Sequence, residues 1–494
     1  MSHAVSFLAF DLGAASGRAV VGHFDGERLS LQEVHRFPNG PVQVRDSLHW
    51  NVLRLYSELK YGLAKSRDEF GLELVSLGLD TWGVDSALLD KHGALLGNPY
   101  HYRDARTNGM FEEAFRRVSR EEIFEQTGIQ FLQINTLYQL LSIVISESPL
   151  LSAAETLLMT PDLFNYWLTG QKVSERTIAS TSQCFNPSTG DWAGTLLERM
   201  GIPSHIFPQI VQPGTVLGKL ASDVAHETGA QDVSVVAPGC HDTACAVAAV
   251  PATQSYYAYL SSGTWSIVGA EVSQPAITSK SLAYNFTNEG GVCDTIRLLN
   301  NITGLWLIQE CRRTWAADGN LLSYTELTRL AQAARPFAGI IDTDATEFQS
   351  PGDMPARIRE FCLRTGQEAP QSQGAVARTV LESLALKYRW TLEKLEEILE
   401  CHLEPVHIVG GGSQNQLLNQ LTANALGRPV VTGPVEATAV GNVLMQMLAL
   451  GHIASLEEGR DLVRRSFEMA TYLPHETNLW DEAYGRYLDL TTCD

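Results

Sequence analysis

The sequence predicts an α/β protein built from two similar domains. Strands rich in β-branched residues alternate with amphipathic helical stretches, as in layered α/β folds. A length of 494 residues is too great for one hydrophobic core, which favours two large domains. The third observation is a repeat, because the strand–turn–strand plan of residues 7–24 recurs at residues 256–272, about half a chain later.

The opening hairpin, FLAFDLGAASGRAVVGHF at residues 7–24, contains a loop of very small residues. An apolar strand ends on Asp11, and residues 13–17 are all Gly, Ala or Ser before Arg18. Such a loop leaves its backbone N–H groups open to an anion. No Gly-Lys-Ser/Thr follows and the next element is a strand, so the loop fits neither the Walker motif nor the dinucleotide fingerprint. A tight hairpin with an incidental acidic residue is the alternative.

A helix over residues 50–65 and a strand over residues 74–80 follow the hairpin. Apolar residues recur near helical spacing in the first and on alternate positions in the second. The strand ends on Asp80, before Thr-Trp-Gly, and polar groups at such strand ends lie where α/β sheets bind ligands. Asp80 therefore either contacts a ligand or merely ends its strand.

A third loop, in VHIVGGGSQNQLLNQL at residues 406–421, places three glycines between a short strand and a helix. Consecutive glycines cost backbone entropy, so something requires a close approach to the main chain. A nucleoside lying on the backbone near the start of a helix has that requirement. A plain strand-to-helix turn is the alternative.

Charge and composition exclude several classes of protein. The formal net charge is −20 with no run of Lys and Arg, which argues against nucleic acid as a partner. No segment approaches the length of apolar chain that a membrane span needs, and the first residues do not resemble a signal peptide, so we expect a cytoplasmic protein without a membrane partner. The eight cysteines are scattered and are expected to be reduced thiols.

The two hairpins and the glycine loop, in this order, resemble the actin-like ATPase superfamily, and the chain is identified as a member of its FGGY carbohydrate kinases. The resemblance extends over nearly the full length. The motifs that carry it are DLGAASGR (11–18), GLDTWGVD (78–85), YRDART (102–107), TGIQF (127–131), NTLYQL (135–140), HDTA (241–244), LSSGTWS (260–266), TNEGG (287–291), NITGLWLIQ (301–309), HIVGGGSQN (407–415) and GPVEATA (433–439).

This resemblance implies two actin-like (ribonuclease H-like) domains, each a mixed sheet flanked by helices, with an interdomain cleft. Residues 1–250 are expected to form the N-terminal domain, with sugar binding, the first phosphate hairpin and the catalytic base. Residues 251–494 are expected to form the C-terminal, nucleotide-binding domain. The partners implied are a small-molecule sugar and ATP, with Mg²⁺ as cofactor, and the protein is expected to be a monomer or a small homo-oligomer.

The implied reaction transfers the γ-phosphoryl group of ATP to a primary hydroxyl. L-Rhamnulose, giving the 1-phosphate, is the expected acceptor, and L-fuculose or D-xylulose is the alternative. Ser86 departs from the family pattern, where an aromatic residue is usual, and this leaves substrate preference open. Two other classes stay open: an ATP-dependent conformational machine of the chaperone or filament kind, and a sugar sensor without turnover.

Functional residues are implied by matching the family motifs to this sequence. The catalytic base is Asp242, which from its position alone could equally be a helix N-cap, and Asp11 holds Mg²⁺ through water. Asp80 and Arg103 are weaker candidates for the sugar site. The implied sugar contacts are Gly83, His241, Asp242, Thr243 and Asn301, and the implied nucleotide contacts are Ala14, Ala15, Ser16, Gly17, Arg18, Thr264, Gln309 and Gly411.

Overall fold

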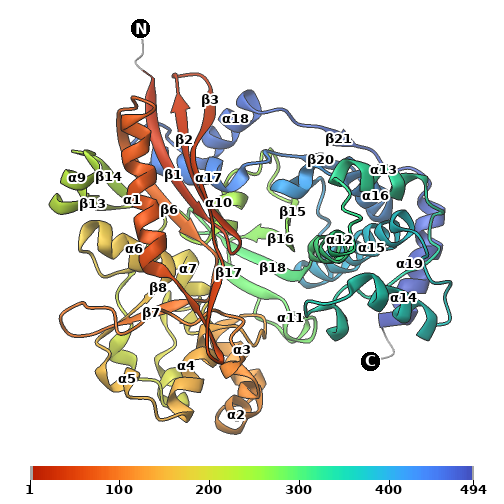
Figure 1. The fold of residues 1–494 in the computed structure, drawn as a ribbon, viewed down its shortest axis with the longest axis horizontal. Coiled ribbons are helices and arrows are strands. Elements are labelled where there is room, and N and C mark those ends of the chain that lie inside the picture. Colours follow the sequence, from red (N-terminus) through yellow and green to blue (C-terminus); the bar gives the residue numbers. More distant parts are fainter. Residues whose placement is uncertain (1–3, 492–494) are drawn as a thin grey trace. The chain divides into compact units, whose positions relative to one another are not determined.

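The computed structural model describes residues 4–491, so Cys493 lies outside the described residues (Figure 1). The chain divides into two compact units. The first unit combines residues 1–251, 271–298 and 436–467, and the second combines residues 252–270, 299–435 and 468–494. Each unit is therefore built from segments that lie far apart in the sequence.

The first unit is organised around a six-stranded mixed sheet with the order β13-β14-β6-β1-β2-β3. Strands β1 and β6 are parallel, as are β6 and β14, whereas the other neighbouring pairs are antiparallel. The strands are β1 (Val5–Leu12), β2 (Ser16–Phe24), β3 (Leu29–Pro38), β6 (Leu74–Thr81), β13 (Thr215–Lys219) and β14 (Ser234–Ala237).

Helices pack on both faces of this sheet. Helices α1 (Val52–Asp68) and α6 (Thr160–Thr169) contact the sheet, and α1 begins after Asn51, whose side chain accepts from the backbone N–H of Arg54. Helix α17 (Ala437–Ala449) crosses β1 and β6 and packs closely on α10 (Asp242–Ala248). A Cβ at residue 441 would overlap the carbonyl oxygen of Cys245, so this approach requires glycine.

The other elements of the first unit lie beside the sheet or in the chain between its strands (Figure 1). They are β4 (Pro41–Val44), β5 (Ser47–Trp50), β7 (Ser86–Leu89), α2 (Met110–Arg117), α3 (Arg120–Thr127), α4 (Thr136–Ile145), α5 (Pro149–Ala153), β8 (Thr156–Met159), β9 (Ser174–Glu175), α7 (Arg176–Ser180), β10 (Phe185–Asn186), β11 (Asp191–Trp192), α8 (Gly194–Met200), β12 (Ile210–Val211), α9 (Ser222–Thr228), α11 (Ser279–Ala283) and α18 (Leu456–Ser466).

A second mixed sheet has the order β17-β18-β16-β15-β19-β20-β21. Strand β15 pairs antiparallel with β16 and parallel with β19, just as β1 pairs with β2 and β6, which confirms the repeat predicted from the sequence. Its strands are β15 (Ala258–Ser262), β16 (Trp265–Val272), β17 (Thr287–Gly290), β18 (Ile296–Thr303), β19 (Val406–Val409), β20 (Val430–Thr432) and β21 (Thr471–Tyr472).

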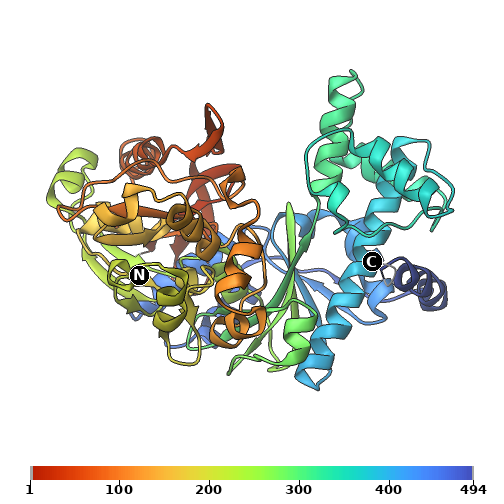
Figure 2. The ribbon, with the colours of Figure 1, turned by 90° about the horizontal axis from the view of Figure 1, so that it is seen from below.

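The helices of the second unit include the longest one that the structure describes, α15, which lies alongside the sheet (Figure 2). They are α12 (Trp306–Ala317), α13 (Tyr324–Ala333), α14 (Met354–Arg364), α15 (Gln373–Leu399), α16 (Gln416–Leu426) and α19 (Thr477–Thr491). Two mixed sheets flanked by helices confirm the predicted α/β class. Between residues 4 and 491, no helix is both long and apolar enough to cross a lipid bilayer.

Candidate active site

Three neighbouring strands of the first sheet bring charged side chains into one row. In register, Asp11 of β1 stands opposite Arg18 of β2 on one side and Asp80 of β6 on the other. Arg18 donates to one Asp11 oxygen from Nη2 at 2.7 Å and from Nε at 3.0 Å. Its other terminal nitrogen pairs with Glu436, the residue before α17. The Arg18 guanidinium is therefore already shared between two carboxylates.

Asp80 is fully buried and depends on α17 for its hydrogen bonding. Asn442 Nδ2 donates to Asp80 Oδ2 at 2.6 Å, whereas Oδ1 is buried and has no hydrogen-bond partner among residues 4–491. Burial, followed by the charge of Asp11, raises the pKa of Asp80 well above its ordinary value. One turn further along α17, Gln446 donates to the backbone oxygen of Leu8 at 3.0 Å and fixes the helix to β1.

Asn39, which directly follows β3, fixes the loop between β1 and β2. Gly13 N donates to Ser16 O at 2.9 Å, and Asn39 donates to the carbonyls of Gly13 and Ala15 at 2.8 and 3.0 Å. Ala15 is exposed at the tip and Ala14 is half-buried. Gly17 is small for a different reason, because a Cβ there would overlap the ring of Phe37.

The segment that precedes α10 continues the row of polar residues beside β6. Thr81 N donates to Cys240 O at 2.9 Å, which places Cys240 and His241 next to the end of β6. The Glu175 carboxylate accepts from Cys240 N at 3.0 Å, and Thr177 Oγ1 accepts from His241 N at 3.1 Å. These bonds fix the main chain of the segment from the α7 side.

Asp242 is the first residue of α10, and His241 occupies the N-cap position, so the N-cap alternative for Asp242 is wrong. The Asp242 side chain is 30% exposed; its Oδ1 accepts from Thr243 Oγ1 at 3.0 Å and lies 3.4 Å from His241 Nε2. Burial raises the pKa of Asp242, His241 opposes that rise, and the carboxylate of Asp11 adds to it. This carboxylate is both perturbed and accessible.

Gly83 lies in the turn that follows β6. Its position is close-packed, because a Cβ there would stand 3.1 Å from Thr181, whose hydroxyl accepts from Val84 N at 3.0 Å. The preceding residue, Trp82, donates from its backbone N–H to Leu12 O at 3.2 Å. The turn is therefore anchored to β1 on one side and to the end of α7 on the other.

The buried carboxylate of Asp85 holds the same turn in place through hydrogen bonds. Asp85 Oδ2 accepts from the indole N–H of Trp50 at 2.5 Å and of Trp82 at 2.8 Å, and Oδ1 accepts from Gln139 Nε2 at 3.0 Å. Burial raises the pKa of Asp85 to about 6, although all three donors oppose the rise. Asp85 uses both of its oxygens as acceptors, which the single oxygen of an asparagine amide cannot do.

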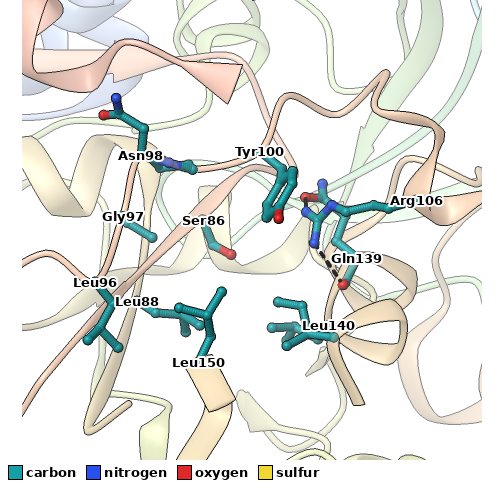
Figure 3. Close-up of a pocket in the computed structure, with 13 residues that line it drawn as sticks. Ser86, Leu88, Leu96, Gly97, Asn98, Tyr100, Arg106, Gln139, Leu140 and Leu150 are labelled. Carbon is teal, nitrogen blue, oxygen red and sulfur yellow. Dashed lines mark hydrogen bonds between the residues drawn. The ribbon is translucent and has the colours of Figure 1, made fainter. Parts of the chain in front are cut away.

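Ser86 lines a pocket beside this network rather than the row of charged residues (Figure 3). Tyr100, Arg106 and Gln139 form its polar part, with Arg106 donating to Gln139 Oε1 at 2.7 Å. None of the five predicted sugar contacts lines this pocket. Ser86, the residue that departs from the family pattern, therefore lies in a pocket that contains none of the predicted sugar contacts.

The second unit holds four of the predicted residues, Thr264, Asn301, Gln309 and Gly411. Thr264, in the turn between β15 and β16, and Gln309 of α12 are brought together, with Gln309 Nε2 donating to Thr264 Oγ1 at 3.1 Å. Asn301 lies half-buried on β18. In the glycine loop, a Cβ at Gly412 would overlap Ser262, whereas no described atom lies within 4 Å of a Cβ at Gly411. Gly411 is therefore the glycine that leaves room for a ligand.

Sequence reasoning missed the side chains that support these residues. Asn442 lies 362 residues after Asp80, and no local pattern connects the two. Glu436 and Glu289 stand inside motifs that were recognised, GPVEATA and TNEGG, but nothing in those motifs identifies their partners. Glu175 follows no motif, and only its place directly before a helix could have indicated a role at a helix end.

Comparison with known sequences places both parts of the chain in one family. Sequence models of the FGGY family of carbohydrate kinases match residues 6–249 with the N-terminal domain and residues 258–450 with the C-terminal domain. A rhamnulokinase of Bacteroides thetaiotaomicron is 45% identical over 479 residues, covering 97% of this chain and 98% of that protein. A rhamnulokinase of Oceanobacillus iheyensis is 41% identical over 465 residues, covering 94% and 97%.

Solved structures share the fold. A gluconate kinase from Lactobacillus acidophilus matches with a TM-score of 0.81 at 17% identity, covering 99% of this chain and 98% of that one. A xylulose kinase from Rhodospirillum rubrum matches with a TM-score of 0.81 at 18% identity over the same shares of the two chains. The two-domain α/β architecture is therefore one that sugar kinases of different specificity have.

The raised pKa of the buried Asp85 predicts how the stability of the protein depends on pH. A folded-state pKa raised from 3.8 to about 6 means that the folded protein keeps a proton that the unfolded chain loses. The contribution of Asp85 to the free energy of unfolding is therefore fully present below pH 4 and is lost as pH rises to about 6, by up to about 3 kcal/mol. In Asp85→Asn this loss disappears, so between pH 4 and pH 7 the variant gains up to that amount relative to wild type.

Urea denaturation of both proteins across this pH range measures the difference. Asp90→Asn is the control, because backbone N–H groups lower the pKa of the half-buried Asp90 and give a pH dependence of the opposite sign. Parallel stability curves for wild type and Asp85→Asn would contradict the interpretation of Asp85.

Proposed function

Because the chain belongs to the FGGY family of carbohydrate kinases, we propose that it acts as a rhamnulokinase. It transfers the γ-phosphoryl group of ATP to the 1-hydroxyl of L-rhamnulose and gives L-rhamnulose 1-phosphate and ADP, in L-rhamnose catabolism. The observation that carries this proposal is similarity along almost the whole chain to proteins named rhamnulokinase. The geometry of the charged row in the first unit supports a phosphoryl transfer that needs a base.

Asp242 is the proposed general base. It takes the proton of the sugar hydroxyl while the hydroxyl oxygen forms a bond to the γ-phosphorus, and the bond from that phosphorus to the β-phosphate oxygen breaks as ADP leaves. Its partial exposure at the start of α10 makes the carboxylate reachable by a sugar. Burial raises the pKa of Asp242, which brings the base nearer to the range suited to proton transfer at neutral pH.

Four of the five proposed sugar contacts, the base itself included, belong to the first unit. Gly83, His241 and Thr243 lie on the two segments that meet where β6 ends beside Cys240. Polar groups fixed by their own hydrogen bonds can discriminate between hydroxyl configurations, because an epimer leaves one of them unpaired. Asn301 of β18 is the further proposed sugar contact.

ATP is proposed to use loops in both units. In the first, residues 14–17 have small side chains in a turn whose backbone suits a phosphate, and Arg18 adds a positive charge. In the second, the paired side chains of Thr264 and Gln309 and the unobstructed face of Gly411 suit the nucleotide. The similar hairpins of the two sheets support the proposal of one phosphate loop in each.

Asp11 is the proposed residue for Mg²⁺, through water. The donor set fits, because Mg²⁺ prefers oxygen ligands and the Asp11 carboxylate stands in register with that of Asp80, whose buried Oδ1 lacks a hydrogen-bond partner among residues 4–491. When bound, this ion supplies charge neutralisation for the phosphates. Arg18 holds the Asp11 carboxylate in place, and it also limits how many Asp11 oxygens are free.

Substrate preference is the direct test of the proposed function. With ATP and Mg²⁺, kcat/KM for L-rhamnulose is expected to exceed the values for L-fuculose and D-xylulose by about tenfold or more, since each unpaired buried polar group costs about 1–3 kcal/mol. A coupled assay of ADP release measures all three sugars. Higher efficiency with L-fuculose or D-xylulose would overturn the substrate assignment, and no turnover of any sugar would favour a sensor or an ATP-dependent machine.

Replacement of the base tests the mechanism. Asp242→Asn is expected to lower kcat by about 10²–10⁴-fold, which is about 3–5.5 kcal/mol of transition-state stabilisation, while ATP still binds. Single-turnover kinetics and nucleotide titration of the variant measure the two effects separately. Asp68→Asn, at the exposed end of α1, is the control and should retain wild-type kcat. A variant at residue 242 that keeps a third of the wild-type rate would place the base elsewhere.

Removal of the divalent cation tests the role of Asp11. Excess chelator is expected to abolish ADP formation, and added Mg²⁺ or Mn²⁺ should restore it, because the charge on the transferred phosphoryl group must be neutralised. Asp11→Asn should raise the Mg²⁺ concentration that gives half-maximal rate. Full turnover in excess chelator would contradict both the role of Asp11 and the kinase reaction.

A further inference from the structure

Two buried charged side chains, those of Glu289 and Arg297, meet beside the His241 ring in the first unit. Glu289 lies on β17 and Arg297 on β18. Glu289 Oε2 is 3.1 Å from His241 Nδ1 and 3.0 Å from Arg297 Nη2, which is itself 3.0 Å from His241 Nδ1. The side chains of Arg297, Glu289 and His241 are only 0%, 7% and 11% exposed. The opposite ring nitrogen, Nε2, faces Asp242 at 3.4 Å.

The charges around His241 decide where its proton lies. Burial favours the neutral acid of Glu289, but Arg297 and His241 outweigh burial, and the pKa of Glu289 lies below its ordinary value. An ionised carboxylate only accepts hydrogen bonds, so Nδ1–H and Arg297 Nη2–H can both donate to Oε2. With the proton on Nε2 instead, Nδ1 could accept from Arg297 Nη2 at 3.0 Å, but its lone pair would also lie 3.1 Å from the charged Glu289 oxygen and be repelled by it.

The main chain of His241 does not depend on Glu289. Its backbone N–H donates to Thr177 Oγ1, and Cys240 N donates to Glu175, both from the α7 side. Arg297 has its own anchor, because Nε donates to Gly290 O at 2.9 Å. Glu289 therefore acts on the orientation and protonation of the imidazole ring, while other bonds hold the backbone.

We propose that Glu289, fixed by Arg297, is a positioning residue that keeps a proton on His241 Nδ1 and aims Nε2 at Asp242 and the sugar. This inference rests on the proposed function in one respect, the assignment of Asp242 as the base. The Nε2 atom, 3.4 Å from Asp242 Oδ1, is then the ring atom that faces the base. The motif TNEGG, which the proposed site residues leave unused, thereby acquires a role in the reaction.

The position of the His241 ring affects how readily the Asp242 carboxyl ionises. The groups that face this carboxylate are His241, the hydroxyl of Thr243, and the carboxylates of Asp11 and Asp80, with Arg18 beyond Asp11. Of these, the two carboxylates oppose ionisation, and His241 favours it. Loss of Glu289 should therefore leave less of the base ionised at low pH.

The first experiment reads the proton directly and needs no substrate. Histidine-labelled protein is compared by ¹H–¹⁵N NMR at pH 8 in wild type and Glu289→Gln, with the His241 signals assigned by His241→Asn. The wild type should carry its proton on Nδ1, and in Glu289→Gln the proton should shift toward Nε2, because Arg297 can then donate to Nδ1. A wild-type ring protonated on Nε2, or no change in the variant, would overturn the proposal.

Kinetics supply the second readout. With the ketose that wild type uses best, Glu289→Gln should lower kcat at pH 7 by about 10–100-fold. The acid limb of kcat/KM should move to higher pH, so the deficit shrinks toward pH 9, while KM for ATP stays unchanged. A deficit that is constant across this range would indicate a structural role only and would overturn the proposal.

A matched control separates this role from loss of a buried ion pair as such. Glu271 and Arg460 form another buried pair in the first unit, 2.5 Å apart, so Glu271→Gln removes the same kind of charge. It should lower stability without moving the His241 proton or the acid limb of the pH profile.

If Glu289→Gln fails to fold, the double variant Glu289→Gln with Arg297→Gln removes both charges together and leaves no buried charge alone. If the wild-type enzyme does not phosphorylate L-rhamnulose, the proposed substrate is wrong. The NMR result then decides the role of Glu289.

Discussion

The close packing of α17 on the first sheet is the constraint on which the rest of the candidate site depends. Gly441 permits the helix to touch the backbone of α10 at Cys245. Asn442, the next residue, and Gln446, one turn later, then reach Asp80 and the backbone of β1. A helix held farther away would leave Asp80 buried without a donor, which costs more than the hydrogen bond itself contributes. The position of α17 thereby determines that of the charged row.

This packing explains how three carboxylates coexist within a small volume. Like charges at close range raise one another's pKa in a medium of low dielectric constant, so each requires a different means of stabilisation. Asp11 has Arg18, Asp80 has the amide of Asn442, and Asp242 has His241 and partial exposure to solvent. The three environments differ, and only the carboxylate of Asp242 combines a raised pKa with access from outside.

Local sequence patterns predicted the elements, whereas partners far apart in the chain stayed hidden. The small residues after Asp11 and the strand ending on Asp80 indicated a ligand edge, and register places the two aspartates side by side. The repeated hairpin predicted two sheets of the same plan. Composition could not show that Gly17 is small because of Phe37, or that His241 rather than Asp242 is the N-cap. Such details depend on tertiary packing, which cannot be predicted from the spacing of residues or from their secondary-structure propensities.

The discontinuity of the first unit has a consequence for biosynthesis. Its sheet is complete once residue 237 has been made, but the segment 436–467 that covers one face of this sheet is translated much later. During that interval the nascent chain exposes an apolar sheet face that carries an aspartate without its amide partner, a surface prone to association. A gene fragment that stops near residue 250 would keep the same surface permanently. Soluble expression of the first unit therefore requires either the whole chain or a graft of α17, and slow elongation through the second unit should increase the need for chaperones.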